Sequence, residues 1–198
     1  MEMTTTQTWI ILAGIAVLLL IALAWWFLYQ KKQSKRLQQR FGPEYGLAVD
    51  GLGSRTKAES ELKEREKRVE HLHILVLEPA EAARFSEAWR ALQGRFVDNP
   101  KDAVVQADRL VRELMQKRGY PMGDFEHRAA DISVNHPTVV ANYRAAQIIA
   151  ESSKRGEADT EALRKAVVHY RALFDELLEV REARQAAIPT TQKKVVQP

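Results

Sequence analysis

Apolar residues are distributed unevenly along the chain, as one continuous run followed by periodic segments. Residues 9–29 contain no charged side chain. At roughly 1.5 Å per helical residue, such a run of about 21 residues spans a hydrocarbon core of about 30 Å. Aromatic residues lie at both ends of the run, as is typical of membrane helices. The pattern predicts a transmembrane helix over 9–29, preceded by an N-terminal tail at 1–8.

A cleavable signal peptide is the alternative interpretation of this run, because Ala22 and Ala24 resemble the small residues of a cleavage site. Two features favour an uncleaved anchor. The residues before the run contain no lysine or arginine, and the apolar run continues past Ala24 to Tyr29. We therefore expect the helix to remain as a single-pass anchor.

Basic residues follow the anchor closely. Because lysine and arginine near a membrane helix favour the cytoplasmic side, we expect a protein of the cell (inner) membrane with its N-terminus outside and its C-terminal domain in the cytoplasm. The same residues are expected to contact lipid headgroups, at about 1 kcal/mol each. They are Lys31, Lys32, Lys35, Arg36 and Arg40.

Beyond the anchor, apolar positions recur every three or four residues, which is typical of amphipathic helices. The clearest stripes predict helices over about 79–97, 100–118 and 160–184. No alternating strand pattern competes with them. The fold class predicted is all-α, with one N-terminal transmembrane helix followed by a soluble bundle of about five helices in a domain at 55–185.

Large apolar side chains occupy the predicted core face of each helix. Several are aromatic, and helical bundles can hold an apolar ligand between their helices. Their helical spacing favours ordinary core packing. The expected core residues are Ala82, Phe85, Trp89, Leu92, Phe96, Val104, Ala107, Val111, Leu114, Val139, Val140, Tyr143, Ala146, Ile149, Leu163, Val167, Tyr170, Phe174 and Leu177.

The segments that flank this domain have a different composition. Residues 30–54 join the basic juxtamembrane stretch to a sequence that holds four glycines, and Gly42-Pro43 predicts the end of the anchor helix. We expect a glycine-rich hinge after it. Residues 186–198 lose the helical period and contain two prolines, which predicts a disordered tail.

A highly charged segment over 55–73 has glutamates four residues before lysines or arginines, which stabilises a solvent-exposed helix. Its narrow apolar stripe includes Leu62, Val69 and Val76, which are seven residues apart. That spacing allows a homo-oligomer through a coiled coil at 58–76. Fewer than three heptads favour instead a helix packed by one edge on its own domain.

Charge and cysteine content exclude some classes of function. Of 30 basic and 26 acidic residues, five and one lie in 1–40, which leaves 25 of each in 41–198. A balanced domain argues against a nucleic-acid partner, which requires a basic face. The absence of cysteine excludes thiolate chemistry and fits a reducing compartment.

Ionisable residues gather at 120–144, the strongest candidate for a site. An acid and a histidine on facing elements can share a proton, so Asp131 and His136 are the catalytic candidates. Tyr143 and Arg144 are the candidates for binding an anionic ligand. Helix capping explains most of the cluster without chemistry. Phosphate loops, nucleophile elbows and helical metal motifs are absent from the sequence, so no metal or cofactor is predicted.

Four segments carry a resemblance to a known group of proteins. The chain resembles an uncharacterised family of bacterial helical proteins, often membrane-anchored or labelled as secreted. The resemblance implies a helical domain of that kind and no assigned activity. The segments are RFGPEY at 40–45, FSEAWRALQGRFVDNP at 85–100, GYPMGDFEHRAADISVNHPTVVANYR at 119–144 and VVHYRALFDEL at 167–177.

Two functions from different classes fit these observations. The leading hypothesis is a membrane-tethered interaction or scaffold module whose bundle binds an unknown protein partner. The alternative is an enzyme or small-ligand sensor that uses the polar cluster at 120–144. The two differ in whether Asp131 and His136 converge in one pocket.

Overall fold

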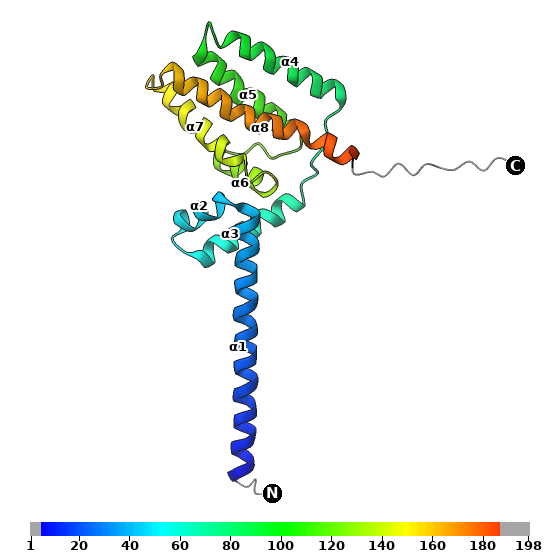
Figure 1. Cartoon of the computed structure of the whole chain (residues 1–198), viewed down its shortest axis with the longest axis vertical. Coiled ribbons are helices and arrows are strands. Elements are labelled where there is room, and N and C mark those ends of the chain that lie inside the picture. The colour runs from blue at the N-terminus through cyan, green and yellow to red at the C-terminus, as the bar shows by residue number, and fades with distance from the viewer. Residues whose placement is uncertain (1–4, 187–198) are drawn as a thin grey trace, which may run out of the picture. The chain divides into compact units, whose positions relative to one another are not determined.

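The structure, a computed structural model, describes residues 5–186, and over that part it is helical without strands (Figure 1). This confirms the predicted all-α class. The chain divides into two compact units, residues 1–62 and 63–198. The tail predicted at 186–198 falls, but for its first residue, outside the described residues. The helices are α1 (Thr5–Phe41), α2 (Pro43–Leu52), α3 (Arg55–Glu70), α4 (Pro79–Arg95), α5 (Pro100–Lys117), α6 (Phe125–Asn135), α7 (Val140–Lys154) and α8 (Thr160–Ala186).

Helix α1 of the first unit is long and apolar enough to cross a membrane, by its length and composition. Its large apolar side chains from Leu12 to Tyr29 are 50–79% exposed. The helix begins at Thr5, before the predicted start, and continues past the apolar run to Phe41, as the polar residues after Tyr29 predict. Near its end the pattern becomes one-sided, with Leu37 and Phe41 buried.

The predicted hinge after α1 is wrong over most of its length, because residues 43–52 form helix α2. A glycine lies directly before α2 and another directly after it. Gly42 and Gly53 have φ values of 50° and 61°, in the left-handed region that favours glycine, and they separate α2 from its neighbours. The glycines between them fit within a helix at a modest cost in stability, and the buried Tyr45 and Ala48 give α2 an apolar side.

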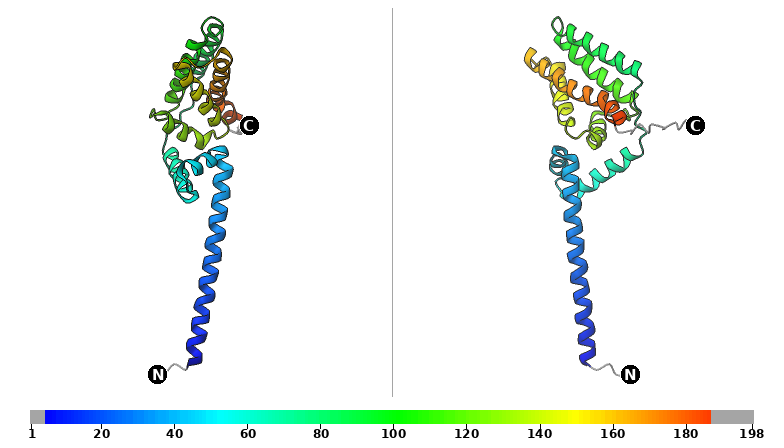
Figure 2. Two further views of the ribbon diagram at one scale, coloured as in Figure 1. Left: turned by 90° about the vertical axis from the view of Figure 1, so that its left-hand side faces the viewer. Right: turned by 45° about the vertical axis from the view of Figure 1, so that its right-hand side comes forward.

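In the second unit α8 is the central helix. It packs extensively against α7 and α5, α4 packs against α5, and α6 packs against α7 (Figures 1 and 2). The predicted stripes form one hydrophobic core, in which the ring of Trp89 stacks on that of Phe174 with centroids 4.5 Å apart. Five helices therefore make the bundle, as the stripes predict.

Helix α3 ends at Glu70, earlier than the predicted boundary near residue 73, and residues 73–78 have no regular structure. The backbone N–H of Leu75 donates to the carbonyl of Arg118 at 2.9 Å, which ties this segment to the end of α5. The end of α3 at Glu70 shortens the apolar stripe at 58–76 that would form a coiled coil. Leu62 and Val69 are buried within the chain, and Val76 lies beyond the helix, so the three do not form an exposed helical seam.

Candidate functional site

Helix α6 carries the two catalytic candidates near its end. The carboxylate of Asp124 accepts a hydrogen bond from the backbone N–H of His127 at 2.9 Å and starts the helix, as capping predicts. The helix continues to Asn135, so Asp131 lies within it and His136 caps its end.

Asp131 is one of the few buried carboxylates of the described residues, with a side chain 4% exposed. Its Oδ1 accepts a hydrogen bond from Nε of Arg68 on α3 at 2.9 Å, and the Arg68 side chain is 40% exposed. A buried carboxylate is stable as an ion only when such a partner neutralises it. The residue thus has a structural role in holding the last turns of α3.

His136 has a separate partner. Its Nδ1 lies 3.1 Å from Oε1 of Glu176 on α8, and the imidazole itself is buried. Burial lowers the pKa of His136 below its usual value; the neighbouring Glu176 opposes this effect, and the positive charge of Arg118 adds to it. The ring is therefore neutral at pH 7, and its Nδ1–H donates to the Glu176 carboxylate.

Arg118 is the residue of this region that the sequence pattern does not indicate. It caps the end of α5, is 2% exposed, and donates from its guanidinium to the backbone carbonyl of Leu177 on α8. Its neighbour Gly119 has a φ of 88°, and a Cβ there would lie 2.5 Å from the carbonyl oxygen of His73. Glycine is therefore required at this turn, directly after the buried Arg118. Gly119 is the sequence signal that a special turn exists.

The two binding candidates, Tyr143 and Arg144, point in different directions. The hydroxyl of Tyr143 is buried and accepts a hydrogen bond from Nε of Arg128 at 3.2 Å, and burial raises its pKa. Arg144 is paired with Glu126 at 2.7 Å on the outside of the bundle. Its guanidinium also lies over the ring of Phe125, 5.9 Å from the centroid. The structure does not bring the two together around one ligand position.

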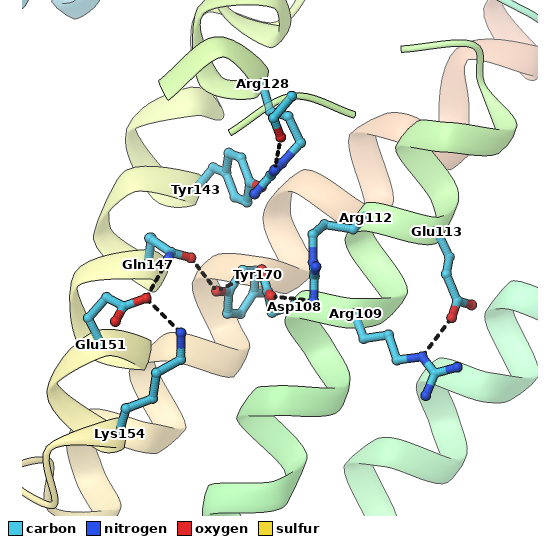
Figure 3. Close-up of polar contacts among 11 residues, drawn as sticks. Asp108, Arg109, Arg112, Glu113, Arg128, Tyr143, Gln147, Glu151, Lys154 and Tyr170 are labelled. Carbon is cyan, nitrogen blue, oxygen red and sulfur yellow. Dashed lines mark hydrogen bonds and ion pairs between the residues drawn. The ribbon is translucent and has the colours of Figure 1, made fainter. Parts of the chain in front are cut away.

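A second polar network, which the sequence pattern does not indicate, lies beside Tyr170 (Figure 3). The Tyr170 hydroxyl lies 3.3 Å from Oδ1 of Asp108 and 3.4 Å from Oε1 of Gln147, which joins α8 to α5 and α7. Two further contacts extend it. Arg112 forms an ion pair with Asp108 at 3.0 Å, and the Gln147 amide donates a hydrogen bond to Glu151 at 2.9 Å. Burial, and then Asp108, raises the pKa of Tyr170, so the phenol remains neutral and donates.

These contacts define what the polar residues do chemically. Asp131, His136 and Tyr143 each have a partner on another part of the second unit. They do not line any of the three surface grooves described for it. Among the residues that the structure describes, no group of three or more histidine and acidic side chains is arranged to hold a metal ion. The arrangement joins helices. Three members of the Tyr170 network, Asp108, Arg112 and Gln147, also line a groove of about 410 Å³ between α5 and α7, where each of them has a partner within the chain.

The largest of those three grooves, with a volume of about 580 Å³, lies between α4 and α5. We call it the α4–α5 groove. Charged residues Arg95, Arg109 and Glu113 form its rim, and Arg109 is paired with Glu113 at 2.8 Å (Figure 3). The rest of its lining is mixed. Its apolar part consists of small or aliphatic side chains, Ala88, Ala91, Leu92, Val105 and Leu110, and its polar part of Asp102 and Gln106.

The candidate lipid-contact residues occupy the part of α1 beyond the apolar run, and all five are exposed there. Lys31 and Lys32 follow Tyr29 directly, whereas Arg40 lies one residue before the end of the helix. Because α1 is continuous, these side chains lie at defined distances from the apolar segment.

Comparison of the chain with protein-family models, curated proteins and solved structures gives no match. The resemblance to a family of bacterial helical proteins stays an expectation. A function for this chain is therefore argued from its own residues and their geometry.

Proposed function

We propose that the chain is a membrane-anchored helical module that binds another protein. The observation that carries the anchor is helix α1, whose apolar side chains from Leu12 to Tyr29 remain exposed along the whole helix. Each large side chain left in water would cost about 1.5–3 kcal/mol relative to burial, and a bilayer removes that cost. The polar continuation of α1 then leads to helices α2 and α3.

The orientation proposed is a cytoplasmic bundle, on the basis of the five basic residues that follow the apolar run. With the bundle in the cytoplasm, these residues face the anionic lipids of the inner leaflet. The balanced charge of residues 41–198 favours a protein partner over a nucleic acid.

The α4–α5 groove is the surface proposed for the partner. Ala88 and Ala91 are three residues apart on α4, so both open onto the groove and let another helix approach closely. Small apolar side chains beside charged and polar ones match an amphipathic helix that lays its apolar side into a groove. The partner segment proposed is therefore an amphipathic helix whose rim residues carry charges of both signs.

Anchoring and orientation are tested together by cysteine labelling, since the natural chain has no cysteine. Thr5→Cys places a thiol before the apolar run, and Lys165→Cys places one on the exposed side of α8. In cells with a permeabilised outer envelope, a membrane-impermeant maleimide should modify the first variant and reach the second only after the inner membrane is broken. Extraction at high pH should leave the chain in the membrane. Release by alkali, or labelling of both variants in unbroken cells, would contradict the proposal.

Partner binding is tested by photo-crosslinking from position 88 in the full chain. A single protein should crosslink from the groove, and Ala91→Trp should reduce its yield at least tenfold because the indole fills the space that a partner helix needs. Val168→Trp, on the exposed side of α8, is the matched control and should leave the yield unchanged. Equal losses in both variants, or no defined product, would show that the groove is not the binding surface.

A further inference from the structure

Glu59 connects the three helices of the first unit. Its Oε1 accepts hydrogen bonds from the hydroxyl of Ser34 on α1 at 2.5 Å, from the hydroxyl of Tyr45 on α2 at 2.8 Å, and from Nε of Arg55 at 3.0 Å. Desolvation raises the pKa of Glu59, but these three donors outweigh it, so that pKa lies below its usual value. The carboxylate is thus ionised at neutral pH and fixes the start of α3 against α1.

This contact sets the height of α3 above the apolar run. Ser34 follows Tyr29 by five residues, which is about 7.5 Å along a helix. Bilayers extend about 5–8 Å beyond the hydrocarbon core on each side. Ser34 and Glu59 therefore lie at the outer edge of the headgroups when α1 spans a bilayer. Figure 1 shows the turn between α2 and α3 folded back beside the last turns of α1, and Figure 2 agrees.

Exposed lysines lie within one helical turn of this height on both helices. Lys57 is exposed in the first turn of α3, two residues before Glu59, and Lys31, Lys32 and Lys35 are exposed on α1. Within the described residues none of these four lysines has a carboxylate partner. The acids nearest to Lys57 in sequence are Glu59, which its three donors hold, and Glu61, and both are partly exposed. Residues 31–61 contain seven basic and four acidic residues, so the charge at headgroup height is positive.

We propose that the first turn of α3 and the lysines of α1 form one surface that binds the headgroups of anionic lipids. We call this the juxtamembrane surface, made of Lys31, Lys32, Lys35 and Lys57. The inference rests on the proposed function, because it requires α1 to span the bilayer. It adds a specific claim: a part of the chain 26 residues after Lys31 in sequence returns to the membrane, held there by Glu59.

The test uses the full chain reconstituted in phosphatidylcholine vesicles that contain about 10% phosphatidylglycerol. Thr56→Cys carries a fluorophore in the first turn of α3, between Arg55 and Lys57. The quencher is a nitroxide on the headgroup of either the anionic or the zwitterionic lipid, at equal amounts. At low salt the anionic quencher should be about threefold more effective, since each nearby lysine favours anionic lipid up to about fivefold. The preference should disappear near 0.5 M salt.

Charge variants distinguish this surface from a general effect of net charge. The triple variant Lys31→Gln, Lys32→Gln and Lys57→Gln should reduce the threefold preference to nearly one. A matched triple variant in the second unit, Lys67→Gln, Lys101→Gln and Lys165→Gln, makes the same change in net charge and should retain it. Equal reductions in both would overturn the inference.

Insertion is measured in the same vesicles by resistance to alkaline extraction. A chain that resists extraction but shows equal quenching by both lipids overturns the juxtamembrane surface and leaves the anchor intact. A chain that is extracted overturns the proposed function itself. A weak signal from both quenchers at position 56 would place the start of α3 away from the membrane and also overturn the inference.

Discussion

The two sides of helix α8 hold the bundle together by different means. Phe174 and Glu176 are two residues apart and so point in nearly opposite directions on the helix. Phe174 meets Trp89 of α4 in a stacked aromatic pair, whereas Glu176 meets the buried imidazole of His136 at the end of α6. The backbone carbonyl of Leu177 also accepts a hydrogen bond from the guanidinium of Arg118.

The difference decides which conditions each side tolerates. Aromatic burial depends on area and packing, so its contribution changes little with pH or with salt. Buried ionisable groups contribute only in one protonation state and become costly when a partner is removed. The apolar side of α8 should therefore supply most of the free energy of unfolding, and the polar side should make that free energy depend on pH.

The largest effect is expected on the apolar side. Trp89→Ala removes a fully buried ring and should lower the free energy of unfolding by about 3–5 kcal/mol, equally at pH 7.5 and pH 5.5. Urea unfolding of a fragment that begins at Arg55, followed by circular dichroism, measures it. Val168→Ala, on the exposed side of α8, should change it by less than about 0.5 kcal/mol. A loss below 1 kcal/mol for Trp89→Ala would show that the apolar side is not the main support.

The same fragment tests self-association. Because the hydrophobic core of the second unit begins near Leu77 and includes neither Leu62 nor Val69, we expect the fragment to sediment as a helical monomer. A stable dimer would indicate that the stripe at 58–76 opens and pairs between copies.

The apolar side of α8 could be predicted from the sequence, because its information is local. Helical periodicity places Trp89 and Phe174 on core faces, and both are buried as predicted. Capping is local too: the side chain of Asn99 accepts from the backbone of Asp102 at 3.2 Å at the start of α5, as the motif predicts.

The buried polar contacts of the second unit could not be predicted, because their partners are distant in sequence. Asp131 pairs with a residue 63 positions away, and Arg118 reaches a backbone carbonyl 59 positions away. Charged residues on helix surfaces are common, and periodicity does not show which of them turn inward. The glycines at 42–53 predict a hinge, but residues 43–52 form helix α2. The burial of Tyr45 and Ala48 offsets the cost of the internal glycines.

The second prediction removes one member of the charge pair that joins α3 to α6. Arg68→Met leaves Asp131 buried without its partner and should lower the free energy of unfolding by about 2–3 kcal/mol at pH 7.5, less than for a fully buried pair because Arg68 is partly exposed. Adding Asp131→Asn should recover part of the loss. Arg164→Met, which breaks an exposed pair with Glu161, is the control and should cost below about 1 kcal/mol. Similar losses for both arginine variants would show that Arg68 is not needed to stabilise the buried Asp131 carboxylate.

The smallest effect is the dependence of stability on pH that His136 contributes. Its folded pKa is lowered, so the unfolded chain binds a proton more readily, and folding is favoured most above the unfolded pKa of about 6.5. As pH falls from 7.5 through this value, the free energy of unfolding should decrease by at most about 1.4 kcal/mol per pH unit for this one proton. His136→Gln cannot titrate and should flatten the curve between pH 7 and pH 5. Carboxylates with lowered pKa, such as Glu59, act at lower pH, near and below 4.5, and remain as a separate decline in both proteins. If the two proteins show the same slope between pH 7 and pH 5, Glu176 stabilises a protonated imidazole as well as the fold stabilises the neutral one, and the polar side of α8 does not sense pH through His136.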